Sequence, residues 1–444
     1  MRFLFVRVAL VAALCLPSTG IPAWAQSSAR TGDQLQFVVY LSRHGVRSPT
    51  GSLDQYYSYS RARWPLWDVP PGYLTAHGFE DMRLLGAYDR MLLAREGLLK
   101  AAGCDDAARV SFYADSDQRT RESGKALAEG MFPACSVLPG ALPEGTPDPL
   151  FHPLRVAQPN PEPVSSDDDF NAQATRLTQA LRPQLTELDH ILATCGTPAS
   201  PDHNRISILD IPTVAEPGKG RDGRPGELRG PLGIASTLTE NFLLEFTEGM
   251  PMQDVAWGCA DGASLRRLIG LHTAASNARR RDRSVARMQA VNLLDRIGTT
   301  MEHAVANGRD AHAPSSRGDR ALFLIGHDTN LNNVAGVLHL SWFADGRRDD
   351  TPPGSALVVE LWRSRSTGSY FVRLWYIAQT LDQMRNAVTL NVRQPPQRIP
   401  LRLSGCAAVD GSGCTWNSFE ELLARASHPS GAIQRGTKKQ RRGE

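Results

Sequence analysis

The sequence predicts an α/β fold, with a sheet domain flanked by helices and a smaller helical cap domain. Short runs rich in β-branched and aromatic residues occur near both ends of the chain, as in buried strands. Three of these runs are followed at once by polar and charged residues, whereas the middle of the chain has mostly helical patterning. Because ligands bind beyond the carboxyl ends of strands in open α/β sheets, we expect the three polar segments to meet at one crevice.

The three runs and the segments that follow them are easily located. Residues 35–41 precede the segment Arg-His-Gly-Val-Arg-Ser-Pro at 43–49. Residues 110–114 precede 115–119 and a predicted helix at 120–131, and residues 321–325 precede Gly-His-Asp-Thr-Asn at 326–330. Two further strands, 356–361 and 370–378, flank a polar turn and predict a hairpin.

Helical patterning in the middle of the chain predicts a cap inserted into the sheet domain. We place the cap at 166–285 and the two parts of the sheet domain at 26–165 and 286–430. Within and beside the cap, the sequence predicts helices at 170–192, 232–249 and 263–283 and a long loop at 196–230. The basic tail at 431–444, which lacks apolar residues from 436 onward, is expected to be a frayed, solvated end rather than a nucleic-acid-binding segment.

The first 25 residues have the pattern of a secretory signal peptide. Arg2 and Arg7 precede an apolar stretch at 8–16, and Ala23-Trp24-Ala25 forms a small-x-small cleavage site. The apolar stretch is too short to span a bilayer, which argues against a membrane anchor. We therefore expect a periplasmic or secreted protein.

Composition and cysteine content restrict the function further. The 444 residues are 41% hydrophobic and carry a net charge of only +3, so no overall attraction to nucleic acid or to an anionic membrane is expected. Of seven cysteines, Cys15 lies in the signal peptide, and the remaining six form an even set typical of disulfides in an exported protein. None has the spacing of a zinc site, so no metal and no cofactor is predicted.

The segment at 43–49 has the residues that histidine-based phosphoryl transfer requires. A neutral imidazole at His44 can attack phosphorus, and arginine forks at Arg43 and Arg47 can neutralise the equatorial oxygens. Arg119 is a third candidate for this role, with Arg121 as a competitor. Gly45 is expected to let the oxyanion approach the backbone, and a helix beginning near 49 would add N–H donors.

Departure of the alcohol requires a proton. Asp328, after the third strand, is the predicted general acid, and His327 beside it is a further phosphate donor. A carboxylic acid in this role must be protonated at the start of turnover, so the rate should favour acidic pH.

The sequence resembles the histidine acid phosphatases, in the branch with RHGxRxP near the N-terminus and HD near the C-terminus. The segments at 43–50, 115–121, 237–244, 326–330, 351–354 and 379–385 all have close counterparts in the periplasmic bacterial phytases of that family. The resemblance implies a histidine-phosphatase (phosphoglycerate-mutase-like) sheet domain with a helical cap and no metal cofactor. It assigns the nucleophile to His44 and the proton donor to Asp328, and it assigns phosphate binding to Arg43, Arg47, Arg119 and His327.

The resemblance also implies pocket residues and disulfides. Thr50, Asp115 and Glu240 map near the substrate pocket. The pairs Cys104–Cys135 and Cys406–Cys414 match family disulfides, which leaves Cys195 and Cys259 as the third expected pair. The implied partner is a small phosphorylated substrate, phytate or a sugar phosphate, bound by a monomer.

Three interpretations of substrate remain open. Thr329 favours a phytase, because the related glucose-1-phosphatase has HDSN where this chain has HDTN at 327–330. A glucose-1-phosphatase or broad-specificity acid phosphatase is the alternative, and an inactive phosphate-binding protein on the same fold is a third hypothesis, against which the intact His44 and Asp328 argue. A cluster of arginines could serve a multiply charged substrate or form a solvated helix face: Arg279, Arg280, Arg281, Arg283 and Arg287.

Overall fold

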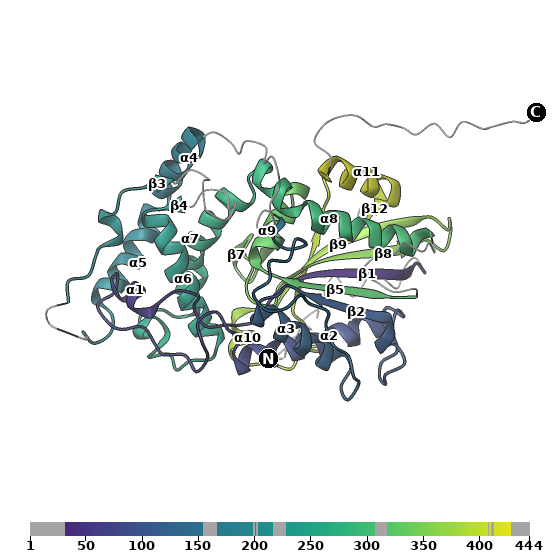
Figure 1. The fold of residues 1–444 in the computed structure, drawn as a ribbon, viewed down its shortest axis with the longest axis horizontal. Coiled ribbons are helices and arrows are strands. Elements are labelled where there is room, and N and C mark those ends of the chain that lie inside the picture. The colour runs from purple at the N-terminus through teal and green to yellow at the C-terminus, as the bar shows by residue number, and fades with distance from the viewer. Residues whose placement is uncertain are drawn as a thin grey trace, which may run out of the picture.

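A computed structural model describes residues 32–153, 167–198, 200, 203–215, 228–306, 318–406, 408–409 and 413–427. Its two parts are a broad sheet layered between helices and a bundle of helices beyond one end of that sheet (Figure 1). The predicted signal peptide at 1–25 and the basic tail at 431–444 lie outside the described residues.

The strands are β1 Gln34–Arg43, β2 Val110–Ala114, β3 Val214–Ala215, β4 Leu228–Arg229, β5 Ala321–Gly326, β6 Phe343–Ala344, β7 Arg347–Arg348, β8 Ala356–Arg363, β9 Tyr370–Ala378, β10 Gln397–Leu401, β11 Ala408–Val409 and β12 Gly413–Thr415. The helices are α1 Leu53–Tyr57, α2 Ala76–Arg95, α3 Gln118–Met131, α4 Asp167–Ala180, α5 Arg182–Thr194, α6 Pro231–Thr247, α7 Gly262–Arg280, α8 Arg283–Ala306, α9 Asp328–Leu338, α10 Leu381–Arg385 and α11 Trp416–Ser427.

The main sheet has the strand order β11-β12-β9-β8-β1-β5-β2, with β10 paired to β9. β1, β5 and β2 are parallel, and their last residues are in register: Arg43 faces Gly326, and Ala114 faces Ile325. β8 runs antiparallel to β1, so its first residue Ala356 lies opposite Ser42 at the same edge. Three strand ends and the loop before β8 therefore converge at one edge, as predicted for an open α/β sheet.

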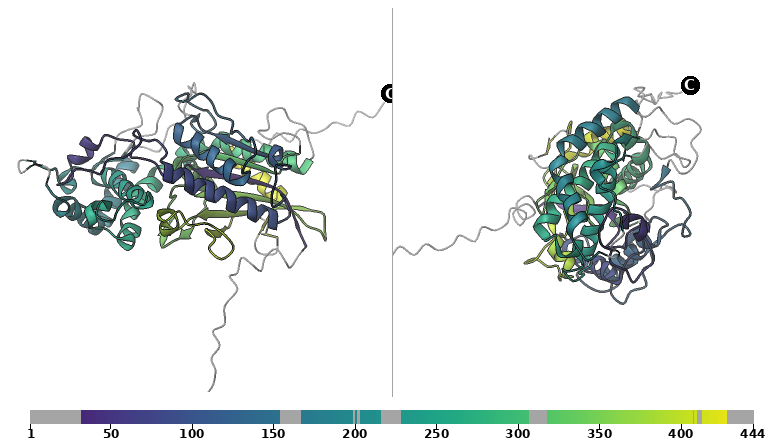
Figure 2. Two further views of the ribbon diagram at one scale, coloured as in Figure 1. Left: turned by 90° about the horizontal axis from the view of Figure 1, so that it is seen from below. Right: turned by 90° about the vertical axis from the view of Figure 1, so that its left-hand side faces the viewer.

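Alternation along β1 divides the core into two layers. Phe37, Val39 and Leu41 face the layer that contains α8, α9 and α11, whereas Val38 and Tyr40 face the layer of α2 and α3. All five side chains are almost fully buried. Successive side chains of a strand point to opposite faces, so helices on both sides bury the central residues 37–41 of β1, which are all apolar. Figure 2 shows the sheet between these helical layers.

The helices beyond the sheet have a core of their own. Leu188 of α5, Leu238 and Phe242 of α6 and Leu268 of α7 are buried together with Trp64 from the segment after α1. Trp64 stacks on Phe242 with ring centroids 5.1 Å apart. These helices therefore form a rigid body that can hold side chains over the edge of the sheet.

The predicted strands and the hairpin β8–β9 are confirmed, with small extensions at strand ends. The predicted helix at 170–192 is instead two helices, because the chain breaks at Leu181 before Pro183, whose ring is tolerated only in a first turn. The predicted helix at 263–283 likewise ends at Arg280, and Asp282 caps α8 by accepting a hydrogen bond from the Ser284 amide at 3.0 Å.

The helix considered near residue 49 begins later in the chain. α1 begins only at Leu53 and has five residues, and Arg47 lies in an isolated bridge with Leu74. Helix N-termini do reach the sheet edge, but they belong to α3 and α9.

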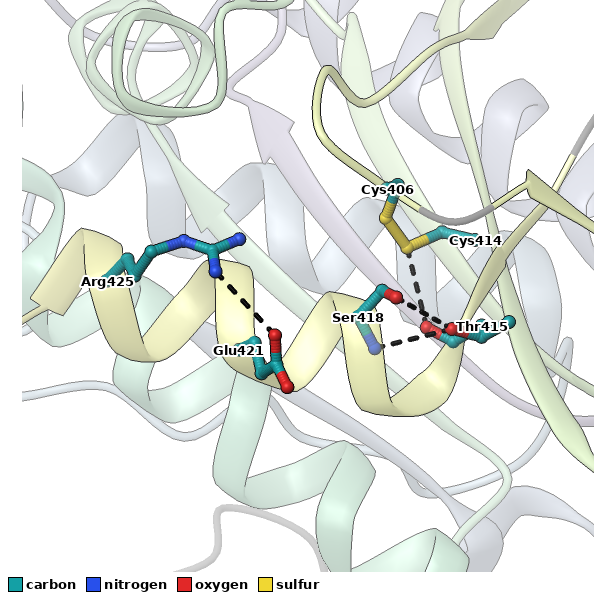
Figure 3. The surroundings of a disulfide bond; sticks show 6 residues. All are labelled: Cys406, Cys414, Thr415, Ser418, Glu421 and Arg425. Atoms are coloured by element: carbon teal, nitrogen blue, oxygen red, sulfur yellow. Dashed lines mark hydrogen bonds and ion pairs between the residues drawn. A yellow bond between two sulfur atoms is a disulfide. The ribbon is translucent and has the colours of Figure 1, made fainter. Parts of the chain in front are cut away.

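The expected disulfides are present within the described residues. Cys104–Cys135, Cys195–Cys259 and Cys406–Cys414 have Cα–Cα distances of 5.7, 6.2 and 5.4 Å. The third lies just before α11, which begins where the Thr415 hydroxyl accepts a hydrogen bond from the Ser418 amide (Figure 3). Among the described helices, none combines the length and the apolarity that crossing a bilayer demands.

Candidate active site

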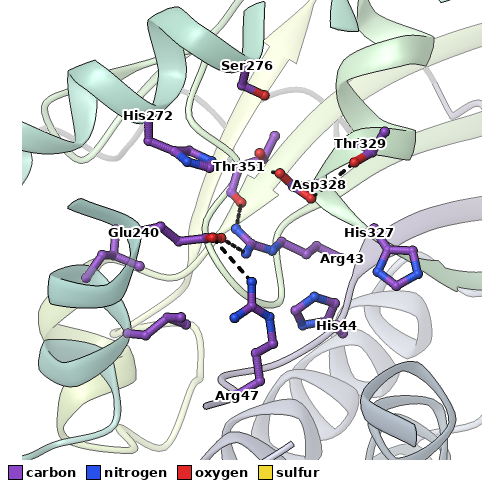
Figure 4. Close-up of polar contacts among 12 residues, drawn as sticks. Arg43, His44, Arg47, Glu240, His272, Ser276, His327, Asp328, Thr329 and Thr351 are labelled. Carbon is purple, nitrogen blue, oxygen red and sulfur yellow. Dashed lines mark hydrogen bonds and ion pairs between the residues drawn. The ribbon is translucent and has the colours of Figure 1, made fainter. Parts of the chain in front are cut away.

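The predicted site residues come together at the shared edge of the parallel strands (Figure 4). Arg43 is the last residue of β1, and His44 follows it, held by a hydrogen bond from its amide to the Gly326 carbonyl at the end of β5. His327 and Asp328 form the start of α9, and Arg119 lies in the first turn of α3. Arg43 and His44 are each only 2% exposed, so both side chains act in a poorly solvated environment.

His44 is held as a neutral imidazole with one free nitrogen. Its Nδ1 lies 2.8 Å from the carbonyl oxygen of Gly45. A carbonyl can only accept, so Nδ1 carries the proton and Nε2 keeps its lone pair. Burial lowers the pKa of His44 well below its usual value, and Arg119 and Arg43 lower it further. The ring can therefore act as a nucleophile even in acidic solution.

Gly45 has a different role from the one expected. Its amide donates to the Ser123 hydroxyl at 2.9 Å, so this N–H does not face the crevice. A Cβ at this position would lie 2.7 Å from the Gly78 carbonyl oxygen and from Met82. Glycine is required because the loop packs directly on α2, and the expected approach of an oxyanion to this backbone was wrong.

One carboxylate from the helical cap, that of Glu240, pairs with both Arg43 and Arg47. Arg43 donates to Glu240 Oε1 at 2.5 Å and Arg47 donates to Oε2 at 3.2 Å, and Arg43 also donates to the Thr351 carbonyl at 2.6 Å. Burial would raise the pKa of Glu240, yet Arg47 and Arg43 lower it to about 2. Glu240 is thus an anionic clamp on both guanidinium groups, as Figure 4 shows.

Arg119 lies in the first turn of α3, beside His327. It pairs with Asp117 at 2.5 Å, and it makes longer contacts of 3.4 Å with His327 Nδ1 and with the Gly72 carbonyl. The Nε groups of Arg43, Arg47 and Arg119 are all buried, and none has a hydrogen-bond partner among the described residues. Three buried guanidinium donors around one histidine are well suited to the oxygens of a phosphoryl group.

His327 belongs to a buried triad with Asp115 and His152. Oδ2 of Asp115 lies 2.6 Å from His327 Nε2 and 2.7 Å from His152 Nε2. Burial lowers the pKa of His327 to about 4, against the opposing effect of Asp115. Although burial would raise the pKa of Asp115, the two histidines hold it well below its usual range. The rings of His44 and His327 meet edge to face with centroids 5.6 Å apart.

The same triad has the residue types of a metal site. Its three ligand-type atoms lie within 4.8 Å of one another. The carboxylate–imidazole distances are those of hydrogen bonds, and the cation of Arg119 lies beside His327. We therefore interpret the cluster as a hydrogen-bonded chain that orients His327.

Asp328 is an ion-paired carboxylate, which differs from the protonated acid expected for the first chemical step. Its Oδ2 accepts a hydrogen bond from Arg280, at the end of α7, and lies 3.8 Å from His272 Nε2. Burial would raise the pKa of Asp328, but Arg280, His272 and Arg43 hold it well below its ordinary value. For Asp328 to carry a proton, the Arg280 contact has to change.

The remaining predicted residues lie around this centre. Thr329 follows Asp328, and its hydroxyl is 3.5 Å from Asp328 Oδ1. Thr50 is exposed near Gly72, whose carbonyl accepts a hydrogen bond from Arg119. Four polar residues that carry no motif of their own were not predicted from the sequence: His152, His272, Ser123 and Ser276.

Comparisons with known proteins show the family and the fold of the chain. A family model described as "Histidine phosphatase superfamily (branch 2)" matches residues 34–193 and 229–376. Phytase AppA of Escherichia coli is 32% identical over 446 residues, covering 94% of this chain and 97% of the relative. A glucose-1-phosphatase of Salmonella typhimurium is 29% identical, covering 96% and 100%. The solved Hafnia alvei phytase in complex with myo-inositol hexakis sulphate has a TM-score of 0.77 at 30% identity, covering 90% and 98%.

Proposed function

This chain belongs to the histidine phosphatase superfamily (branch 2) and is a phosphoric monoester hydrolase, and on this premise we propose that it is a phytase that uses His44 as its nucleophile. The observation that carries the mechanism is the neutral His44, with its proton on Nδ1 and three buried arginines around it. The similarity to phytases along nearly the whole chain supports the substrate.

The first step transfers the phosphoryl group to the enzyme. Nε2 of His44 attacks phosphorus in line with the ester oxygen, the P–O bond breaks, and Asp328 gives its proton to the departing alcohol. Arg43, Arg47 and Arg119 neutralise charge on the equatorial oxygens, and His327, oriented by Asp115, supplies a further donor when protonated. The products of this step are the alcohol and a phosphohistidine.

The second step hydrolyses the phosphohistidine. Asp328, now a carboxylate, accepts a proton from water as the water oxygen bonds to phosphorus. The P–N bond breaks, inorganic phosphate forms, and His44 returns to its neutral state. Each residue thus ends the cycle with the charge it had at the start.

Export is part of the proposal. The segment at 1–25 has the pattern of a signal peptide, and the three disulfides are those of a protein that folds in an oxidising compartment. We also propose that the cap spans 166–285, so that it supplies Glu240, His272 and Arg280 to a crevice built mainly by the sheet domain.

The second candidate activity is that of a glucose-1-phosphatase, which is favoured by relatives of that name with almost complete coverage. Phosphate release by the purified mature chain from phytate, glucose 1-phosphate and p-nitrophenyl phosphate between pH 3 and 7 distinguishes the candidates. A phytase should show its highest kcat/KM on phytate. A preference for glucose 1-phosphate would identify that ester as the substrate in place of phytate and leave the proposed mechanism unchanged. The absence of phosphate release from all three esters would support the inactive phosphate-binding alternative.

A further inference from the structure

One face of helix α7 is polar where the helix passes over the crevice. His272, Ser276 and Arg280 are spaced by four residues and therefore lie on the same face of the helix. Arg280 donates to Ser276 Oγ at 3.2 Å and to Asp328, while Asn332 of α9 donates to Ser276 Oγ at 3.2 Å. Figure 4 shows His272 and Ser276 on the side of the crevice beyond Glu240 and Asp328 as seen from His44.

His272 has one nitrogen without a partner. Its Nδ1 contacts the hydroxyl and the carbonyl of Ser236, each at 3.1 Å. Its Nε2 is buried, has no hydrogen-bond partner among the described residues and lies 3.8 Å from Asp328. The residue is only 7% exposed. Although burial alone would lower it, the nearby carboxylates of Glu240 and Asp328 raise the pKa of His272, which favours an imidazolium aimed at the crevice.

Arg280 is the most accessible member of this group. Its side chain is 28% exposed, compared with 13% for Asp328, so its guanidinium lies closer to solvent than the acid it contacts. Among the five arginines of the 279–287 segment, Arg281 is engaged with Asp349 and the Leu340 carbonyl, and Arg287 donates to the Arg425 carbonyl on α11. Arg280 contacts a predicted catalytic group, Asp328.

We propose that His272, Ser276 and Arg280 form a second phosphate subsite, and that Arg280 leaves Asp328 for a non-scissile phosphate when a substrate with several phosphates binds. This inference rests on the proposed function, and the feature of the substrate that the subsite selects is a second phosphate group. The first phosphate occupies Arg43, Arg47 and Arg119, and a neighbouring phosphate on the same ring reaches the α7 face.

This change of partner by Arg280, from Asp328 to a substrate phosphate, is an exchange that couples substrate binding to acid catalysis. Five charged or titratable groups face Asp328 from four elements: Arg280 and His272 of α7, Arg43 of β1, Glu240 of α6 and Arg119 of α3. The Arg280 contact is the largest favourable influence on the ionised form. When Arg280 neutralises a substrate phosphate instead, Asp328 can take up the proton that the leaving oxygen requires. A monophosphate, with no second phosphate to attract Arg280, leaves the ion pair in place.

Binding without turnover tests the subsite directly. Arg280→Gln removes the charge from the α7 face, and Arg287→Gln is the matched control, because its guanidinium contacts α11 instead. Calorimetry at pH 5 measures the affinity of each protein for myo-inositol hexakissulfate and for inorganic phosphate. Loss of one charge-assisted interaction should weaken hexakissulfate binding about 10- to 100-fold in Arg280→Gln and inorganic phosphate less than about threefold. An equal loss for both anions, no loss, or the same loss in Arg287→Gln would overturn the subsite.

The pH profile tests the exchange. In Arg280→Gln, Asp328 lacks its paired cation and should keep its proton to higher pH. The alkaline limb of the kcat/KM profile for glucose 1-phosphate should therefore lie at higher pH than in the wild type. Arg280→Lys, which retains the cation, should leave the limb close to that of the wild type. A limb that does not move in Arg280→Gln would contradict the exchange. Because calorimetry needs no cleavage, a chain that binds hexakissulfate through Arg280 but does not hydrolyse phytate would refute the proposed substrate and keep the subsite.

Discussion

Glu240 joins the helical cap to Arg43 and Arg47, the arginines proposed to bind phosphate, and its replacement by glutamine should have a pH-dependent effect on stability. The carboxylate pairs with Arg43 at 2.5 Å and with Arg47 at 3.2 Å, and its side chain is 14% exposed. These arginines lower its pKa to about 2 from an ordinary value near 4.5. At about 1.4 kcal/mol per pKa unit, the ionised form contributes roughly 3 kcal/mol to the free energy of unfolding.

The stabilisation by ionised Glu240 depends on pH. Because the folded pKa is depressed, the stabilisation is fully present above the unfolded pKa and is lost as pH falls through the folded pKa, between about 4.5 and 2. The difference in unfolding free energy between wild type and Glu240→Gln should therefore narrow by about 2 kcal/mol between pH 5 and pH 3. Urea unfolding at both pH values measures this difference.

A surface pair provides the control for Glu240. Glu187 contacts Arg267 at 2.5 Å, but the two side chains are 32% and 51% exposed, so Glu187→Gln should cost no more than about 1 kcal/mol at either pH. If the Glu240→Gln difference is the same at pH 5 and pH 3, the carboxylate does not clamp the two arginines in the folded protein and the reasoning fails.

Three further outcomes follow from the site and its supports. Asp328→Asn should slow hydrolysis of alkyl phosphates about 10²- to 10⁴-fold and of p-nitrophenyl phosphate far less, since only a poor leaving group needs the proton; equal losses would remove Asp328 from the acid role. His152→Asn should raise the pKa of His327, because the neighbouring His152 lowers that pKa, so competitive inhibition by phosphate should persist to higher pH; an unchanged pH dependence would count against the triad. The double variant Cys195→Ser, Cys259→Ser removes a disulfide between residues 64 positions apart and should lower the free energy of unfolding in urea by up to about 4 kcal/mol; an unaltered midpoint would show that this disulfide does not stabilise the cap.

Much of the fold could be predicted because its signals are local. Buried strands such as 321–325 are continuous apolar runs, and the polar residues that follow them must lie at the strand ends. The positions of His44, Arg43 and Asp328 around one crevice followed from that rule, and the family resemblance is confirmed by the comparisons.

The long-range contacts of the site could not be predicted in this way. Arg280 reaches Asp328 across 48 residues, and His152 reaches Asp115 across 37, and neither Arg280 nor His152 lies in a motif that would mark the pair. These contacts depend on how α7 and the loop after residue 140 pack against the sheet. The ionised state of Asp328 depends on the first of them, which is why a local interpretation of His-Asp predicted a protonated acid.

The central claim is that His44 carries the phosphoryl group between the two steps. Rapid acid-free quenching of the enzyme during turnover of p-nitrophenyl phosphate, followed by peptide mass spectrometry, measures that intermediate directly. We predict a base-stable, acid-labile phosphate on the peptide that contains His44, absent in His44→Ala, which should fold but release no phosphate. Turnover by His44→Ala at a rate near that of the wild type, or a phosphate on another residue, would rule out His44 as the carrier of the phosphoryl group.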